Sequence, residues 1–139
     1  MDFAPHRRAL LAGIGLSACA TAARTEIERA LIDSEPDETI ALWPGAPPGG
    51  ERVSITEHVT DRPNDLHLRD RIAIHVTRPT LSVFRPTHAN GAALLIVPGG
   101  SYRHVVIDKE GFETARWFAS RGVTCFVLRY RQPYDGWAA

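Results

Sequence analysis

The pattern that most constrains the fold is a strand, a helix and a second strand that follow one another within about 40 residues. Residues 92–97 (AALLIV) are continuously apolar, which is typical of a strand covered on both faces. Residues 109–121 predict a helix with Asp108 as its cap and Gly122 as its end, and its apolar residues share one stripe. Residues 123–130 (VTCFVLRY) predict a second buried strand. This order predicts a parallel βαβ unit and therefore an α/β fold.

The segments before this unit predict extended structure. Apolar and polar residues alternate in three stretches: residues 53–59, 72–76 and 81–84. A period of two predicts half-buried strands, and we expect them to be antiparallel and to lie at the edge of the sheet. Residues 40–50 hold three prolines and three glycines, which disfavour a helix interior and a sheet ladder. We therefore assign residues 21–50 to a tether and an extended Pro/Gly-rich arm, anchored on the body by Leu42 and Trp43.

Residues 1–20 have the layout of an export signal. Arg7 and Arg8 precede the uncharged run 9–23, which is shorter than the roughly 20 apolar residues of a membrane span. The paired arginines resemble a twin-arginine signal, and the residues around Cys19 resemble a lipoprotein signal in which that cysteine is lipidated. Ordinary cleavage beside the same small residues is the alternative. We expect an exported protein, periplasmic or extracellular, that contacts a membrane only through a lipid anchor.

Composition and motifs exclude several classes of protein. The 16 basic and 16 acidic residues give no net charge, so no overall basic field attracts a nucleic acid. Cys19 and Cys125 cannot build a disulfide scaffold, and the absence of a Cys/His cluster in the sequence argues against a metal site. A dinucleotide fingerprint and a P-loop are also absent from the sequence, and we expect no cofactor.

Residues 98–102 (PGGSY), called the glycine turn below, follow the first predicted strand of the βαβ unit. α/β proteins place ligands at this end of a parallel strand. Glycine lets backbone N–H groups point into a cavity, where they can hold a phosphate or the oxyanion of an acyl-transfer intermediate. A tight turn without a ligand is the alternative.

Five segments carry a resemblance to a known family. They are LWPGAPPG (42–49), RPTLSVFRP (78–86), LLIVPGGSY (94–102), DKEGFETARWFASRG (108–122) and FVLRYRQPYDGW (126–137). In this order they resemble the N-terminal half of the α/β-hydrolase superfamily, and most of all its acetylxylan-esterase-like and feruloyl-esterase-like secreted branch. The resemblance implies that residues 51–139 form the N-terminal portion of an α/β-hydrolase domain, with antiparallel edge strands, a parallel βαβ unit and an incomplete sheet.

The resemblance also implies roles for the glycine turn. In the family this turn supplies part of the oxyanion hole, so Gly100 and Ser101 would offer backbone N–H groups and Tyr102 would line the pocket. Gly99 and His104 are further candidates for contact with the substrate, and a solvated loop position is the alternative for His104. Ser101 departs from the glycine that is usual at its position, and a positive φ there would strain the backbone by about 1 kcal/mol. We do not expect Ser101 to be a nucleophile, because the nucleophile-elbow sequence does not surround it.

The family's catalytic Ser, Asp and His follow the segment that this sequence resembles. Gly-x-Ser-x-Gly does not occur in residues 1–139. We therefore expect a carboxylic-ester hydrolase by family that is inactive on its own, with a small-molecule or polysaccharide ester as substrate and the missing C-terminal half as partner. In the family's sheet a strand that follows the nucleophile region flanks residues 92–97, so we expect an unpaired apolar edge and poor solubility. A non-catalytic exported binding module and a fragment of a prolyl-oligopeptidase-like peptidase are the alternatives.

The other chemically active side chains are expected in structural roles. Lys109 and Glu110 would lie with Asp108 at the start of the helix, and Cys125 would lie in the core. Arg129 and Arg131 are expected in structural ion pairs. Four histidines are expected on the surface: His58, His67, His75 and His88.

Overall fold

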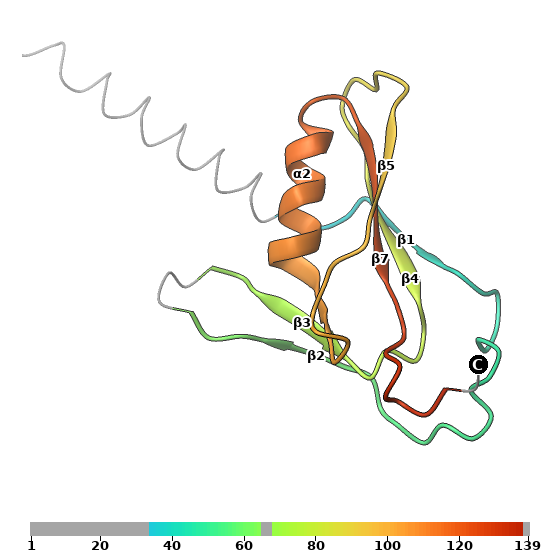
Figure 1. Cartoon of the computed structure of the whole chain (residues 1–139). Helices are drawn as coiled ribbons and strands as arrows, with labels where there is room; N and C mark the ends of the chain where they lie inside the picture. The colour runs from blue at the N-terminus through green and yellow to red at the C-terminus, as the bar shows by residue number, and fades with distance from the viewer. Residues whose placement is uncertain (1–33, 65–67, 138–139) are drawn as a thin grey trace, which may run out of the picture. The chain divides into compact units, whose positions relative to one another are not determined.

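The structure, a computed structural model, describes residues 34–64 and 68–137 (Figure 1). The predicted export signal, Cys19, His67 and residues 21–33 of the predicted tether lie outside the described residues. The described part is a mixed α/β structure with two sheets and a helical segment.

The larger sheet has four strands in the order β1-β4-β7-β5, which are Glu38–Ala41, Thr80–Phe84, Thr124–Arg129 and Ala93–Ile96. β5 and β7 are parallel, with Ala93 beside Thr124 and Ile96 beside Val127. The helical segment connects them, so the predicted parallel βαβ unit is confirmed. β4 runs antiparallel to both of its neighbours, β1 and β7.

The remaining strands form a separate sheet in the order β2-β3-β6, which are His58–Asp61, Arg71–Ile74 and Val105–Val106. The prediction of three antiparallel strands at one sheet edge was therefore wrong in arrangement. β3 pairs with β2 on one side and with β6 on the other, whereas β4 lies inside the larger sheet. β4 is apolar on both faces at Val83 and Phe84, which are 1% and 4% exposed, and this suits an interior strand.

The Pro/Gly-rich arm begins later than the sequence indicates. Ile40 and Ala41 belong to β1, where they lie opposite Leu81 and Thr80 of β4. The prolines and glycines start at Pro44, so they exclude a sheet ladder only after the strand has ended.

The helical segment has two parts, a π-helix η1 over Ile107–Phe112 and an α-helix α2 over Glu113–Ala119. It begins two residues earlier than predicted, and Asp108 is not its cap. The N-cap position is Val106, and the Asp108 carboxylate instead accepts hydrogen bonds from the backbone and guanidinium of Arg71. An arginine partner 37 residues away in sequence has replaced the local capping role.

The core lies between the helical segment and one face of the larger sheet (Figure 1). β4 and β7 supply Phe84, Cys125 and Val127, and the helical segment supplies Phe112 and Ala115. Cys125 is fully buried and free, as predicted. The apolar stripe of the helix therefore packs on the sheet, in agreement with its period.

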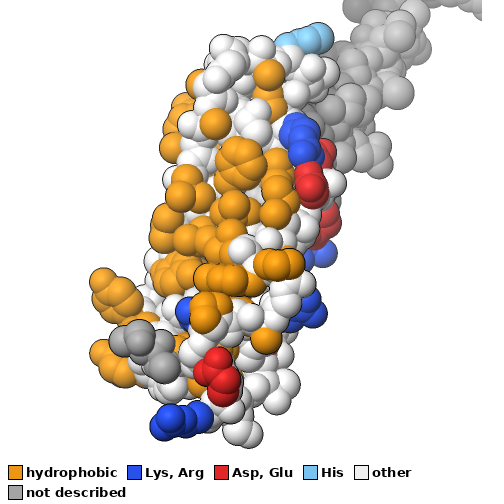
Figure 2. All heavy atoms as spheres, turned by 90° about the vertical axis from the view of Figure 1, so that its right-hand side faces the viewer, with side chains coloured by type: hydrophobic (Ala, Val, Ile, Leu, Met, Phe, Trp, Pro, Cys, Tyr) orange, Lys and Arg blue, Asp and Glu red, His pale blue; other side chains and the backbone are white. Residues whose placement is uncertain are grey.

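Within the described residues, no helix packs on the opposite face of the larger sheet. Successive side chains of a strand point to opposite faces, so Leu95, Phe126 and Leu128 point away from the core. Figure 2 shows hydrophobic side chains gathered over this side. β5 forms one edge of the sheet, and Leu95 and Val97 are 56% and 57% exposed. The prediction that residues 92–97 are covered on both faces was wrong, whereas the expected unpaired apolar edge is present within the described residues.

Leu95→Lys should keep the chain soluble at concentrations several-fold higher than the unchanged chain tolerates. A lysine on an edge strand opposes pairing with the edge of another molecule. Leu68→Lys is the matched control, since Leu68 is similarly exposed at 52% but lies outside this sheet. Sedimentation velocity over a concentration series provides the measurement, and equal improvement by both variants would contradict a role for the β5 edge.

Candidate functional site

The backbone of the glycine turn is strained. Ser101 and Tyr102 have φ angles of 57° and 60°, which residues other than glycine rarely adopt. Gly100 has a φ of 146°, and a Cβ atom there would lie 1.9 Å from the carbonyl oxygen of His104. Residue 100 must therefore be glycine, while Ser101 carries the strain expected for a residue other than glycine at that position.

The glycine turn has three successive backbone N–H groups, at Gly100, Ser101 and Tyr102, that donate no hydrogen bond to the described part of the chain. Its carbonyls are engaged, since Gly99 O accepts from Val106 N at 3.0 Å and Gly100 O accepts from Arg103 N at 3.1 Å. Adjacent unengaged N–H groups are the element that holds an anion or a developing oxyanion.

Two side chains contact the glycine turn from elsewhere in the fold. Glu110 in η1 accepts a hydrogen bond from Gly99 N, with 2.7 Å between that nitrogen and its Oε2 atom. Tyr130, just after β7, donates from its hydroxyl to Pro98 O at 2.7 Å. Neither contact was predictable from the sequence, because neither residue carries a local motif that signals a bond 11 or 32 residues away.

The side chains of the other residues predicted for the site do not form a catalytic group with one another in the described part of the chain. Tyr102 is 69% exposed, and Ser101 is exposed as well. His104 is half-buried. Among the described residues, the Ser101 hydroxyl and the His104 ring make no side-chain hydrogen bond, so no Ser–His pair is assembled there.

Of the remaining histidines, His58 and His88 are exposed, as predicted. His75 differs, because its Nδ1 atom lies 2.7 Å from Oδ1 of Asp135 and its φ is 55°. The two residues are 60 positions apart, so sequence spacing carries no sign of this pair.

The two arginines beside Tyr130 have structural roles. Arg129 forms an ion pair with Glu57 at 3.2 Å, as predicted. Arg131 forms none that the described residues show; it donates to Pro48 O at 2.6 Å, and its guanidinium lies 5.6 Å and 4.5 Å from the ring centroids of Trp43 and Trp137. Trp43 therefore anchors the arm as predicted, whereas Leu42 remains 38% exposed.

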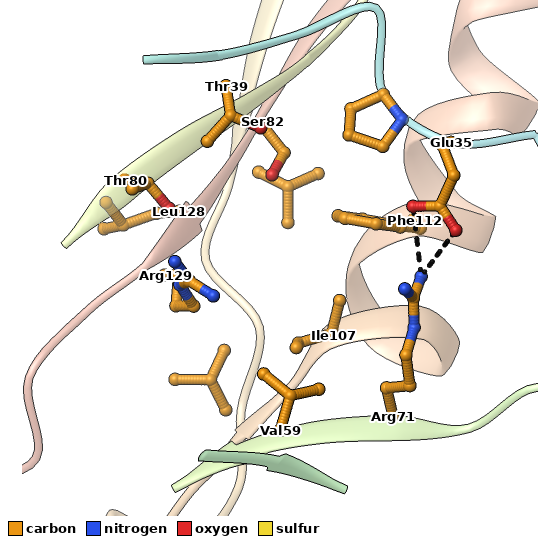
Figure 3. Close-up of a pocket in the computed structure, with 13 residues that line it drawn as sticks. Glu35, Thr39, Val59, Arg71, Thr80, Ser82, Ile107, Phe112, Leu128 and Arg129 are labelled. Atoms are coloured by element: carbon orange, nitrogen blue, oxygen red, sulfur yellow. Dashed lines mark hydrogen bonds and ion pairs between the residues drawn. The ribbon is translucent and has the colours of Figure 1, made fainter. Parts of the chain in front are cut away.

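A cavity of about 190 Å³ lies near the helical segment, and residues of both sheets line it (Figure 3). Its wall is apolar at Ile107 and Phe112 and carries the hydroxyl of Ser82. Arg71 points toward Glu35 at its margin and is already paired with it. The glycine turn does not line this cavity, so the cavity and the predicted site are separate.

Residues 34–64 and 68–137 contain neither a metal-binding cluster nor a membrane-spanning helix. Among these residues, no group of three His, Cys, Asp or Glu side chains is placed to hold a metal ion. No helix in this part of the chain is long and apolar enough to cross a membrane.

The free energy of unfolding should fall as the pH rises above about 9. Burial raises the pKa of the Cys125 thiol; burial, then the charges of Tyr102 and Glu110, raise the pKa of Tyr130. Both groups therefore ionise at lower pH in the unfolded chain than in the folded chain. Their contribution to stability is complete below the pKa values of the unfolded chain and is lost as the pH rises through the raised pKa values of the folded chain. In urea denaturation, Tyr130→Phe should lose less free energy of unfolding at alkaline pH than the unchanged chain. An identical loss would contradict the role of Tyr130 in this pH dependence.

Comparisons with known proteins give a limited match. The sequence is 35% identical over 51 residues to an acetylxylan esterase of Xylanibacter ruminicola. The matched segment covers 37% of this chain and 11% of that esterase. No protein-family model matches the chain, and no solved structure matches it. The match supports an esterase-like relationship and no finer assignment.

Proposed function

We propose that this chain is the N-terminal part of a carboxylic-ester hydrolase and that its glycine turn supplies oxyanion-hole amides. The observation that carries the proposal is the set of three unengaged N–H groups at Gly100, Ser101 and Tyr102. They lie on a strained turn that follows β5, a strand paired in parallel with β7. The partial match to an acetylxylan esterase favours ester chemistry over phosphate binding.

In this proposal an activated serine attacks the ester carbonyl, and negative charge develops on the carbonyl oxygen. The N–H groups of Gly100 and Ser101 stabilise that charge because they are fixed in place and need no other partner. Gly99 cannot take this part, since its N–H is bonded to Glu110. Removal of one such donor in enzymes costs about 10²- to 10³-fold in kcat. Tyr102 and His104 would contact the substrate.

The nucleophile and base would come from another polypeptide segment. β5 is an edge strand in the described part of the sheet, so its outer N–H and C=O groups are open to a further strand. The exposed Leu95 and Val97 side chains suit an apolar neighbour. A segment that brings the Gly-x-Ser-x-Gly elbow beside this edge would place its serine near the glycine turn.

Location and substrate complete the proposal. The export signal of residues 1–20 would direct the chain to the periplasm or the cell exterior, with lipidation of Cys19 as one route to a membrane anchor. The substrate would be a small ester or an acylated polysaccharide, as the name of the relative suggests. Mass spectrometry of the mature N-terminus distinguishes a lipidated Cys19 from ordinary cleavage.

Sequencing of the gene beyond the codon for Ala139 tests the family assignment. A continuation, in frame or after a frameshift, that encodes Gly-x-Ser-x-Gly followed by Asp and His supports the proposal. An unrelated continuation contradicts it and favours a non-catalytic module. Activity of the two segments together is the direct test.

A further inference from the structure

Glu110 holds the glycine turn from the side of the helical segment. Its Oε2 atom accepts the hydrogen bond of Gly99 N at 2.7 Å, although the Glu110 side chain is otherwise exposed. A Cβ atom on residue 99 would lie 2.8 Å from the same oxygen. The close approach of backbone and carboxylate therefore depends on glycine at position 99.

The strain of the turn requires such a restraint. Residues in sparsely populated regions of φ/ψ persist only when the surrounding structure fixes them. Ser101 and Tyr102 both have positive φ, and their own N–H groups have no partner in the described residues. Backbone bonds to the carbonyls of Gly99 and Gly100 fix the turn on its C-terminal side, and the side chains that fix its first residues are Glu110 at Gly99 N and Tyr130 at Pro98 O.

Glu110 is itself carried on a fixed element. It lies in η1, a π-helix, which is a rare conformation found often at functional sites. Asp108, two residues earlier, is 1% exposed and is bound to Arg71 by three hydrogen bonds. The Arg71–Asp108 pair thus fixes the start of the segment that presents Glu110 to the turn.

We propose that Glu110 is a positioning residue of the oxyanion hole. By binding Gly99 N it holds the turn so that the N–H groups of Gly100 and Ser101 stay unengaged and aligned. A carboxylate acceptor makes this hydrogen bond stronger than a neutral one. The catalytic consequence of this inference rests on the proposed function, whereas the restraint of the turn by Glu110 is independent of it.

The restraint is tested in the full chain carrying Leu95→Lys for solubility. Glu110→Ala should raise the amide exchange rate of Gly99 about tenfold or more and shift the Gly100, Ser101 and Tyr102 amide resonances. Glu110→Gln, which keeps an acceptor oxygen, should restore most of both. Glu113→Ala is the matched control, since Glu113 lies on the same helical segment, is exposed, and has a side chain that makes no hydrogen bond or ion pair among the described residues. Unchanged Gly99 exchange in Glu110→Ala would overturn the proposal.

The catalytic consequence is tested in the complex with the nucleophile-bearing segment. Glu110→Ala should lower kcat about tenfold and change KM by less than about twofold, because the oxyanion forms only in the transition state. An unchanged kcat together with faster Gly99 exchange would overturn the positioning role. A wild-type complex that forms but is inactive would contradict the proposed function, and the exchange result would then decide on Glu110 alone.

Discussion

Asp108→Ala should lower the free energy of unfolding by about 3 to 5 kcal/mol, the usual result of removing one partner of a buried ion pair. The side chain of Asp108 is 2% exposed and that of Arg71 is 21% exposed. The variant loses three hydrogen bonds from Arg71 and leaves the guanidinium partly buried without its main partner. Urea denaturation followed by circular dichroism, in the Leu95→Lys chain, measures the change.

Glu35→Ala is the control for this prediction. Glu35 pairs with the same Arg71 but is 51% exposed, so its removal should cost less than about 1 kcal/mol. Similar losses in Asp108→Ala and Glu35→Ala would contradict the account.

The free energy of unfolding at acid pH provides a second test of the Arg71–Asp108 pair. Burial alone would raise the pKa of Asp108, but the hydrogen bonds and charge of Arg71 lower it below its usual value. The pair therefore stabilises the fold above the usual pKa, and this contribution is lost as pH falls through the lowered one.

Gly100→Ala should lower the free energy of unfolding by about 2 to 3 kcal/mol and change the backbone conformation of the glycine turn. The added Cβ would lie 1.9 Å from the carbonyl oxygen of His104, and backbone rather than a flexible side chain would have to move. The same urea titration gives the free energy, and the amide resonances of the turn show the rearrangement.

Ser101→Gly is the matched variant at the next position. It relieves a φ of 57° but increases the freedom of the unfolded chain, so the net change should be a gain of no more than about 1 kcal/mol. A Gly100→Ala variant as stable as the unchanged chain would show that the turn tolerates a side chain, which contradicts the geometry described above.

The elements that sequence analysis predicted well are those set by local pattern. The apolar runs around Leu94 and Val127 gave β5 and β7, and the helical stripe through Phe112 and Ala115 gave the face that packs on the sheet. The separation of β2 and β3 into a second sheet was missed, since strand alternation does not identify the partner. The pairing of β3 with β6 involves only two residues of β6, Val105 and Val106.

The candidate site was predictable only in part. The Gly-Gly sequence at the end of an apolar strand located the turn, and the unusual Ser101 pointed to backbone strain there. The contacts that fix the turn join Gly99 to Glu110 and Pro98 to Tyr130, and they arise only when the βαβ unit is assembled. From the sequence, Glu110 was expected only at the start of the helix and not in contact with the turn.

Hydrolysis of p-nitrophenyl acetate by co-expressed segments tests the central claim most directly. Residues 1–139 would be co-expressed with the polypeptide encoded downstream, and the purified complex compared with each segment alone. We expect activity in the complex only, with a loss of about 10²-fold or more in kcat on Gly100→Ala. A complex that forms without activity, or activity unaffected by Gly100→Ala, would contradict the assignment of the glycine turn to an oxyanion hole.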